Sequence, residues 1–429
     1  MRRRDLGLNS NDYYPRIADK ILTEKLSHAG AVVIRGPKWC GKTRTALQQA
    51  TSVLYMQDPD SWESNHQLAT IKPSLLLQGE KPRLIDEWQE APQLWDAIRF
   101  SIDRGSGAGS YILTGSVTPK TKPAHSGTGR MSFLKMRPMT LIESKESTGE
   151  VSLATLFDGV TDAMGHSDHD VESIAYLVSR GGWPGAVTLN DSIAALETPF
   201  DYITAVADTD ISDADGVKRN PDSARIVMAA YARCCGTQTA IAPMSKTVGR
   251  NGNEMTRQTF SLYVEALRKL SMIEDLTAWT PSLRAKTRIT STPKRYYVDP
   301  SLAVAALGAS PKTLLKDMPT LGMMFEGLCI RDLRVYMEYL KGDVTFYHDG
   351  TGLEADAVLT LRDGRWALAE IKLSAGQADS AVKSLHKVAE RIDTSIMGEP
   401  AFLLVIVAGG YAYRREDGAF VVPIGCLAP

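Results

Sequence analysis

The residues whose types and spacing predict chemistry most directly form the segment Gly36-Pro37-Lys38-Trp39-Cys40-Gly41-Lys42-Thr43, which Arg44 follows. Its pattern is G-x-x-x-x-G-K-[ST], and it lies between an apolar run and a helix-forming segment, as a phosphate-binding loop requires. The glycines let the backbone wrap around phosphates, Lys42 supplies a positive charge, and the Thr43 hydroxyl is suited to bind Mg²⁺. We therefore expect this segment to bind ATP together with Mg²⁺.

A second signal is the pair of acids at the end of the short apolar run Arg83–Asp86. Asp86 is expected to order the Mg²⁺ ion beside Thr43, and Glu87 to polarise the attacking water. The plain alternative is a strand that leaves the core through two solvated acids. The preceding phosphate-loop motif favours the catalytic interpretation.

A third run, Tyr111–Thr114, also ends in hydroxyl side chains. Such a group can orient water beside the γ-phosphate, and Thr114 is the first choice for it, with Ser116 the second. Arg130 follows a Gly-containing loop and is the candidate arginine finger, because a guanidinium from a neighbouring subunit can stabilise transition-state charge. An ordinary surface arginine is the alternative for Arg130.

The elements that must position these residues alternate between strands and helices. Such alternation predicts a parallel sheet covered by helices on both faces, and so an α/β fold. The expected strands are Ala31–Arg35, Ser52–Met56, Arg83–Asp86, Tyr111–Thr114 and Met131–Met136, and the expected helices include Thr43–Ala50 and Ala91–Asp103.

The bulk properties narrow the class of protein without identifying it. A chain of 429 residues exceeds what one core usually organises, so two or three domains are expected. The net charge of −1 neither supports nor excludes a nucleic-acid partner. Five cysteines without paired spacing, no apolar leader and no long apolar run indicate a cytoplasmic protein that does not span a membrane.

The middle of the chain changes charge along its length. Residues 143–215 are typical of acidic helices. Between Lys246 and Arg295 the charge is reversed, because this segment contains ten Lys or Arg and only four Asp or Glu. Apolar residues recur at near-helical spacing from Met255 to Leu276, and a basic stretch follows. This pattern is typical of a winged helix that binds DNA, and the alternative is a packing helix with a solvated basic face. The polar start and the basic stretch comprise Thr256, Arg257, Gln258, Thr259, Arg284, Lys286, Arg288, Lys294 and Arg295.

From about Pro319 the pattern predicts the order helix, strand, strand, strand, helix, strand, with Glu326 on the first helix and Glu354 near Asp356 on a strand. Asp356 followed after a hairpin by Glu370-Ile371-Lys372 resembles the PD-(D/E)XK nuclease superfamily. The resemblance implies that Asp356 and Glu370 bind a divalent metal and that Lys372 assists the nucleophile. A surface hairpin with charge pairs is the alternative, and no proline precedes Asp356.

Two weaker motifs stand between these segments. His166-Ser167-Asp168-His169-Asp170 contains metal-ligand residue types, but the adjacent Gly165 favours a solvated loop. Gly181-Gly182-Trp183-Pro184 interrupts the acidic helices.

Taken in order, the phosphate loop, the Leu-Ile-Asp-Glu strand, Leu-Thr-Gly-Ser, Gly-Arg and Gly-Gly-Trp-Pro resemble prokaryotic AAA+ ATPases that carry a C-terminal domain of unknown function. The similarity runs through most of the chain. It implies an AAA+ core over residues 1–142, a helical lid over 143–215, a winged-helix region over 216–310 and a restriction-endonuclease-like α/β domain over 311–429.

The function expected from these residues is Mg²⁺-dependent ATP hydrolysis that remodels or translocates DNA, duplex or branched, in a homo-oligomer with a hexameric ring. A metal-dependent nuclease activity of the C-terminal domain is a further expectation. The alternative is a nucleotide-switched module that recruits a protein partner and carries an inactive nuclease-like fold.

Overall fold

A computed structural model describes residues 13–115, 125–248, 255–281 and 291–429. The chain divides into two compact units, which are described separately. The N-terminal unit holds residues 1–137 with the short segments 212–218 and 269–271, and the C-terminal unit holds 138–211, 219–268 and 272–429. Four residues singled out from the sequence lie outside the described ranges, namely Ser116, Arg284, Lys286 and Arg288.

The N-terminal unit is built on a sheet of five parallel strands in the order β2-β3-β4-β1-β5. Each expected strand is present to within one residue, because short apolar runs bounded by polar residues form buried parallel strands. The strands are β1 (Ala31–Arg35), β2 (Ser52–Tyr55), β3 (Arg83–Asp86), β4 (Tyr111–Gly115) and β5 (Met131–Lys135).

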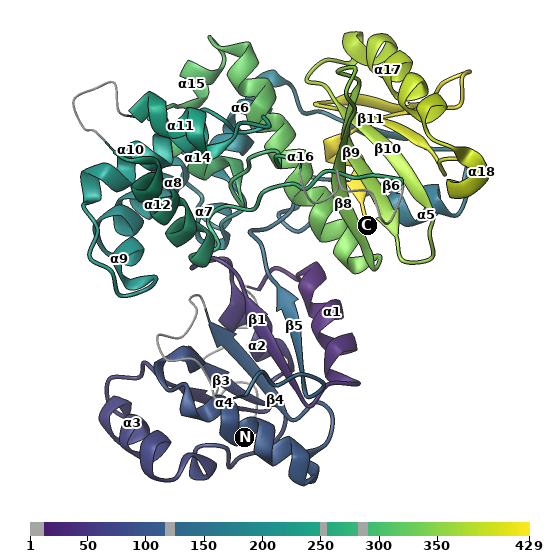
Figure 1. Cartoon of the computed structure of the whole chain (residues 1–429). Coiled ribbons are helices and arrows are strands. Elements are labelled where there is room, and N and C mark those ends of the chain that lie inside the picture. Colours follow the sequence, from purple (N-terminus) through teal and green to yellow (C-terminus); the bar gives the residue numbers. More distant parts are fainter. Residues whose placement is uncertain (1–12, 116–124, 249–254, 282–290) are drawn as a thin grey trace. The chain divides into compact units, whose positions relative to one another are not determined.

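Helices cover both faces of this sheet (Figure 1). Alternate residues of β1 face opposite sides, and Ala31 and Val33 pack in one core with Leu94, Trp95 and Ile98 of α4. The helices α1 and α2 pack on the other face. The predicted α/β arrangement is therefore confirmed, with α1 (Ile17–Leu26), α2 (Lys42–Gln49), α3 (Trp62–Ile71), α4 (Gln93–Ser101) and the short η3 (Pro73–Leu75), η4 (Trp88–Glu90) and η5 (Ile102–Ser106).

The first half of the C-terminal unit consists mainly of helices, and several of them begin at an Asp or Asn whose side chain accepts a hydrogen bond from the first turn. Such caps satisfy backbone N–H groups that the helix leaves unpaired. Part of the acidic character of this region therefore lies at helix starts. The helices are α5 (Leu153–Phe157), α6 (Val171–Arg180), α7 (Pro184–Val187), α8 (Ser192–Ala205), η6 (Val206–Asp210), α10 (Pro221–Ala232), α11 (Ile241–Val248), α12 (Arg257–Lys269), α14 (Pro300–Ala306) and α15 (Pro311–Leu314). The short α9 (Ile211–Asp213) begins in this unit and ends in the segment 212–218 of the N-terminal unit.

The helix expected from Met255 to Leu276 is shorter than its apolar spacing predicts. It ends at Lys269, and Ser271 adopts a positive φ of 58° that turns the chain out of the helix. Beyond the turn, Ile273 and Leu276 form antiparallel bridges with Tyr297 and Lys294. Apolar residues continue beyond Lys269 because the extended segment after the turn buries side chains such as Ile273 and Leu276, just as the helix buries its own.

The second half of the C-terminal unit has the predicted order of a helix, three strands, a helix and a strand. A sheet of seven strands runs in the order β7-β12-β13-β11-β10-β9-β8, and α17 packs on one face of it (Figure 1). These elements are α16 (Met318–Tyr339), β8 (Gly342–His348), β9 (Glu354–Leu361), β10 (Trp366–Ile371), η8 (Ala375–Gln377), α17 (Ala378–Arg391), α18 (Thr394–Met397), β11 (Leu403–Val407), β12 (Gly410–Arg414), β13 (Phe420–Pro423), η9 (Ile424–Cys426) and, paired in a second sheet, β6 (Val151–Ser152) and β14 (Leu427–Ala428).

The interpretation of residues 166–170 as a solvated loop is wrong for His166 and Ser167. Gly165–Ser167 forms the edge strand β7, which pairs antiparallel with Gly410–Ala412 of β12. Only three residues long, the strand is too short for alternation to reveal it in the sequence.

A buried group of charges organises the helical half of the C-terminal unit. The Arg331 guanidinium donates to Asp299 Oδ2 at 2.8 Å and to Asp332 Oδ1 at 2.8 Å, and all three residues are almost fully buried. Asp332 Oδ2 also accepts the Leu141 amide, and Asp299 Oδ2 accepts the Gly182 amide. We call Asp299, Arg331 and Asp332 the arginine hub.

The arginine hub explains the Gly-Gly-Trp-Pro motif. A Cβ atom at Gly182 would lie 2.0 Å from the Met139 carbonyl oxygen, so only glycine permits this approach of two backbones. The Trp183 indole donates to Ser301 Oγ at 2.9 Å, and Ser301 in turn donates to Asp299.

No helix within the described ranges is long and apolar enough to cross a bilayer.

We predict that Arg331→Met lowers the free energy of unfolding of the C-terminal unit by about 3–5 kcal/mol, because two buried carboxylates lose their counter-charge. Chemical denaturation followed by far-UV circular dichroism measures it. The control is Arg225→Met, since the Arg225–Asp208 pair is exposed and such pairs contribute about 0–1 kcal/mol. Equal losses of unfolding free energy in the two variants would show that the arginine hub contributes no more to stability than an exposed ion pair.

Candidate functional site

The backbone of the phosphate loop has the shape that its glycines predict. Gly41 lies at φ 99° directly before α2, and Trp39 adopts φ 63°. A Cβ atom at Gly36 would lie 2.1 Å from the Met136 carbonyl oxygen, so the loop passes too close to its neighbour for any side chain. The curve of the loop between β1 and α2 is therefore fixed by glycine at two positions.

Lys42 is buried and directed along the inside of this loop. Its Nζ donates to the carbonyl oxygens of Gly36 at 3.1 Å and Pro37 at 2.7 Å. The ammonium is thus held within the loop, and its hydrogen-bonding positions are the ones that a phosphate oxygen would take over.

Asp86 joins the phosphate loop to the third strand of the motif. Its Oδ1 accepts hydrogen bonds from the hydroxyls of Thr43, at 2.7 Å, and Thr114. The pairing of Ile85 with Leu113 brings the ends of β3 and β4 together, which places Asp86 and Thr114 side by side. All three predicted residues therefore meet at the carboxyl ends of the parallel strands.

Glu87 is turned toward the same edge of the sheet by a positive φ of 56°. The Gln89 amide donates to Glu87 Oε2, and the Glu87 backbone N–H donates to Thr114 Oγ1 at 3.4 Å. Gln89 was not singled out from the sequence, because nothing in the motif specifies a partner for the acid two residues later.

Arg16 is a second residue that the sequence did not reveal. Its guanidinium is buried and donates to the Cys40 carbonyl oxygen at 2.9 Å and the Arg137 carbonyl oxygen at 2.9 Å. Arg16 therefore ties the phosphate loop, at Cys40, to the backbone at Arg137. Tyr13 lies nearby, where its hydroxyl donates to Asp19 and contacts Thr45. Burial, followed by the hydrogen bond to Asp19, raises the pKa of Tyr13.

Four of the remaining predicted nucleotide residues lie on the same loop, with Pro37 and Cys40 buried, Lys38 half-buried and Trp39 exposed. Arg44 is exposed in the first turn of α2. Arg130, by contrast, is held by an ion pair of 2.8 Å with Asp103 and a hydrogen bond to the Thr128 carbonyl. The close approach at Gly36, the held ammonium and the paired hydroxyls fit a nucleotide with Mg²⁺.

The carboxylates predicted for the C-terminal domain also come together. Lys372 Nζ lies 2.8 Å from Glu370 Oε1 and 3.8 Å from Asp356 Oδ2. Burial and the neighbouring charge of Asp356 raise the pKa of Glu370 to about 7, and they do the same for Glu326. We call Glu326, Asp356 and Glu370, with Lys294 and Lys372, the carboxylate cluster.

Lys294 and Arg295 were expected on a basic surface, and this expectation is wrong. Lys294 is buried and contacts Glu326 and Asp356, while Arg295 is buried against Asp275. Successive residues of an extended segment face opposite sides, so each side chain enters a different acidic environment. Sequence counting treats both as surface charge because their partners are distant along the chain.

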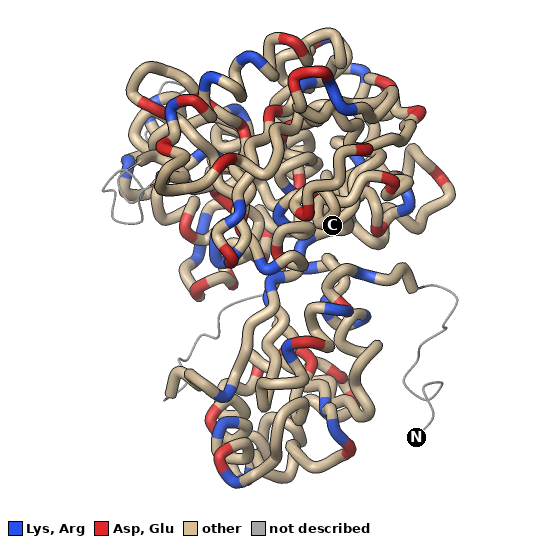
Figure 2. Tube along the Cα trace, turned by 90° about the vertical axis from the view of Figure 1, so that its right-hand side faces the viewer, with Lys and Arg blue, Asp and Glu red and all other residues tan. Residues whose placement is uncertain are grey.

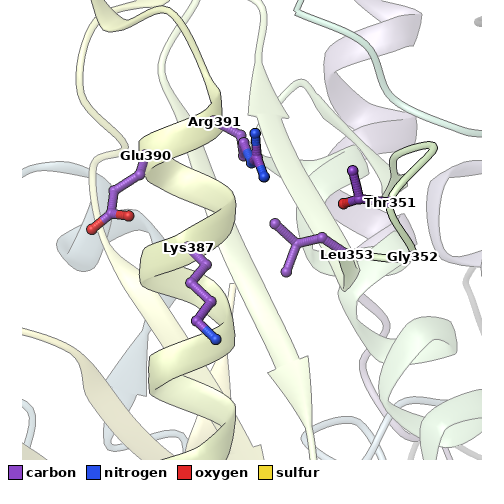
Figure 3. Close-up of a pocket in the computed structure, with 6 residues that line it drawn as sticks. All are labelled: Thr351, Gly352, Leu353, Lys387, Glu390 and Arg391. Carbon is purple, nitrogen blue, oxygen red and sulfur yellow. The ribbon is translucent and has the colours of Figure 1, made fainter.

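A surface hollow between the β8–β9 turn and α17 was not expected either. Figure 3 shows Lys387 and Arg391 on its helical side, with Glu390 directed away from the turn. The lining residues are Thr351, Gly352, Leu353, Lys387, Glu390 and Arg391. This exposed, mixed set offers neither a nucleophile beside a base nor a metal-binding group. In the described part of the chain, no three His, Cys, Asp or Glu side chains are arranged to hold a metal ion.

Three family models match successive parts of the chain. Residues 28–145 match an AAA domain, residues 171–313 match a domain of unknown function (DUF8612), and residues 321–427 match another (DUF4143). The phosphate loop, Asp86 and Thr114 all lie within the first match. The N-terminal unit therefore contains an α/β P-loop domain of the AAA type.

Two curated relatives are 24% identical to this chain over 316 residues, namely the uncharacterized proteins Mb2031c of Mycobacterium bovis and Rv2008c of Mycobacterium tuberculosis. The match covers 73% of this chain and 64% of each relative.

Among solved structures, the chain is similar to the Walker-type ATPase PABY2304 of Pyrococcus abyssi, at a TM-score of 0.43 and 14% identity over 69% of this chain and 96% of that one. It is also similar to a RuvB variant of Thermotoga maritima, at a TM-score of 0.27 and 16% identity over 60% and 88%. A replication initiator DnaA bound to AMPPCP and single-stranded DNA gives a TM-score of 0.29 and 14% identity over 60% and 91%.

We predict that Arg16→Met weakens binding of a non-hydrolysable ATP analogue about tenfold, because the loop carbonyl of Cys40 and the carbonyl of Arg137 after β5 lose their donor, at roughly 1–3 kcal/mol. Arg16→Lys should restore part of the affinity. Isothermal titration measures both, with Lys20→Met as control because Lys20 is an exposed cation of the same helix region. Unchanged affinity in a folded Arg16→Met protein would exclude this positioning role.

Proposed function

We propose that this chain is a Mg²⁺-dependent ATPase of the AAA+ type. The observation that carries the proposal is the double hydrogen bond to Asp86 Oδ1 from Thr43 and Thr114, next to the held Lys42 ammonium. This arrangement supports phosphoryl chemistry because the groups for phosphate, metal and water already meet at one sheet edge.

Each side chain then has a separate task. Lys42 exchanges its two carbonyl partners for phosphate oxygens, and Thr43 and Asp86 are the residues that would order Mg²⁺, which neutralises charge on the phosphates. Glu87, held by Gln89, orients the attacking water and accepts its proton. Thr114 contacts the same edge and responds to the presence of the γ-phosphate.

We further propose that a second copy of the chain completes the site in a ring, with Arg130 as the arginine finger. Its side chain is about half exposed, and its present partner Asp103 is also accessible. An exposed ion pair of this kind is weak, so the guanidinium can exchange Asp103 for a phosphate of a neighbouring subunit. We also propose that residues 143–215 form the lid of the AAA+ core.

We predict that Lys42→Ala abolishes measurable nucleotide binding, whereas Glu87→Gln keeps binding and slows turnover about a hundredfold or more, because a general base acts only in the transition state. Phosphate release and analogue titration separate the two effects. Glu90→Gln is the matched control, since Glu90 is exposed and bonds Gln57. Parallel loss of binding in both variants would refute the assigned roles.

We propose DNA as the partner of the middle region. Its support is the order of three helices, α10, α11 and α12, followed by the antiparallel bridges Ile273–Tyr297 and Leu276–Lys294, while Cys235 after α10 bridges to Arg295. This succession of elements supports the proposed winged helix. The first turn of α12 exposes Arg257, Gln258 and Thr259. At this end of a recognition helix, Gln258 and Thr259 can contact base edges and Arg257 a phosphate.

The positive charge available to DNA is smaller than the sequence suggested. Of the six basic residues between 246 and 295 that the structure describes, four form ion pairs with carboxylates, namely Arg268, Lys269, Lys294 and Arg295. Basic and acidic residues are interspersed along this unit (Figure 2). Binding through α12 is therefore expected to be moderate and to depend on few phosphate contacts.

We predict that Arg257→Ala lowers duplex DNA affinity several-fold and reduces the slope of log affinity against log salt by about 1, as loss of one phosphate contact should. Basal ATP turnover should not change. Fluorescence anisotropy on linear, forked and four-way DNA at three salt concentrations measures it, with Arg225→Ala on α10 as the control. If no DNA binds or stimulates turnover, the middle region recruits a protein partner instead.

A further inference from the structure

The carboxylate cluster lies outside the nucleotide site and combines residues from four segments. Glu326 comes from α16, Asp356 from β9, Glu370 and Lys372 from the end of β10, and Lys294 from the segment before α14. Asp356 and Glu370 are the next residues along β9 and β10 after the pair Ala357–Ala369, so the strand register itself brings them together.

The hydrogen-bond partners show which carboxylate oxygens a metal ion would find accessible. Asp356 Oδ1 accepts Lys294 Nζ at 3.1 Å, and its Oδ2 accepts the Ile371 amide at 3.0 Å. Glu370 Oε1 accepts Lys372 Nζ at 2.8 Å. Among these four oxygens, Glu370 Oε2 alone is buried without a hydrogen-bond partner. Since Mg²⁺ requires a nearly octahedral set of oxygens at about 2.0–2.1 Å, the cluster does not fit a divalent metal in this arrangement.

Lys294 lies between Glu326 and Asp356, two of the three acids of the cluster. Its Nζ lies 3.1 Å from both Glu326 Oε1 and Asp356 Oδ1, and the Tyr296 hydroxyl also donates to Glu326. An ammonium held between two carboxylates neutralises part of their charge, as a metal ion would.

The backbone fixes this lysine in place. Lys294 N–H donates to the Leu276 carbonyl and the Leu276 N–H donates to the Lys294 carbonyl, each at 2.9 Å. The residue is only 3% exposed. Withdrawing the side chain would therefore break a paired segment and leave the buried acids Asp356 and Glu370, with the half-buried Glu326, against Lys372 alone. Such an excess of buried negative charge is costly.

We propose that Lys294 is the permanent internal cation of the carboxylate cluster, where its charge compensates Asp356 in place of a divalent metal. The cluster then fastens the segment before α14 to α16 and β9, and the C-terminal domain does not cleave DNA through a metal. This role is independent of the proposed ATPase reaction.

The test compares Mn²⁺ uptake, measured by electron paramagnetic resonance on nucleotide-free full-length protein, in wild type, Glu370→Gln, Lys294→Met and the double variant. Wild type and Glu370→Gln should take up the same amount of Mn²⁺. Lys294→Met should gain about one Mn²⁺ per chain, because the acids are then left with an excess of charge that a hard cation neutralises, and the double variant should lose that gain.

Two results would overturn the proposal. One is wild-type protein that binds one Mn²⁺ more than Glu370→Gln or cleaves DNA in a Glu370-dependent way. The other is folded Lys294→Met that gains no Mn²⁺. Thermal melting with and without Mn²⁺ is the second measurement, because Lys294→Met is expected to be less stable than wild type. Mn²⁺ should raise the melting temperature of Lys294→Met and leave the melting temperatures of wild type and Lys294→Arg unchanged. If Lys294→Met does not fold, the comparison of Mn²⁺ uptake between wild type and Glu370→Gln still tests the proposal.

Discussion

One oxygen of the Asp86 carboxylate holds the nucleotide site together, because it accepts the hydroxyls of both Thr43 and Thr114. Thr43 comes from the start of α2, and Thr114 from the end of β4. The bond to Thr114 depends on the register of β3 with β4, and a slip by one residue would turn Thr114 to the other face of the sheet. The register of this sheet is therefore the constraint on which the chemistry depends.

The residues of this site that sequence reasoning located are those that a local pattern specifies. Glycines at fixed spacing and a strand that ends in acids restrict the backbone within a few residues, so their geometry follows directly. Arg16 and Gln89 were missed for a different reason. Their partners are a loop carbonyl 24 residues away and a carboxylate that only the positive φ of Glu87 brings into reach. No periodicity encodes such contacts.

The C-terminal sheet shows the same division between local and distant information. The hairpin between β9 and β10, together with the resemblance to the PD-(D/E)XK nucleases, predicted Asp356, Glu370 and Lys372 as one group from the sequence. Lys294 is 62 residues from its partner Asp356, and in the sequence it is only one of many basic residues. A count of charges along a segment predicts surface charge only if the side chains are exposed. This condition fails in an extended segment whose successive side chains are buried on opposite sides, as those of Lys294 and Arg295 are.

Both buried charge groups of the C-terminal unit involve α16, which carries Glu326 and, within two turns, Arg331 and Asp332. Each group also contains a residue from the segment 294–299, namely Lys294 or Asp299. The domain boundary implied by the two matched families of unknown function lies between these partners, at residues 313–321. Buried ion pairs add little net stability over apolar contacts, but a single unmatched charge is strongly unfavourable. The two matched segments therefore depend on each other to bury these charges, which explains why they form one compact unit.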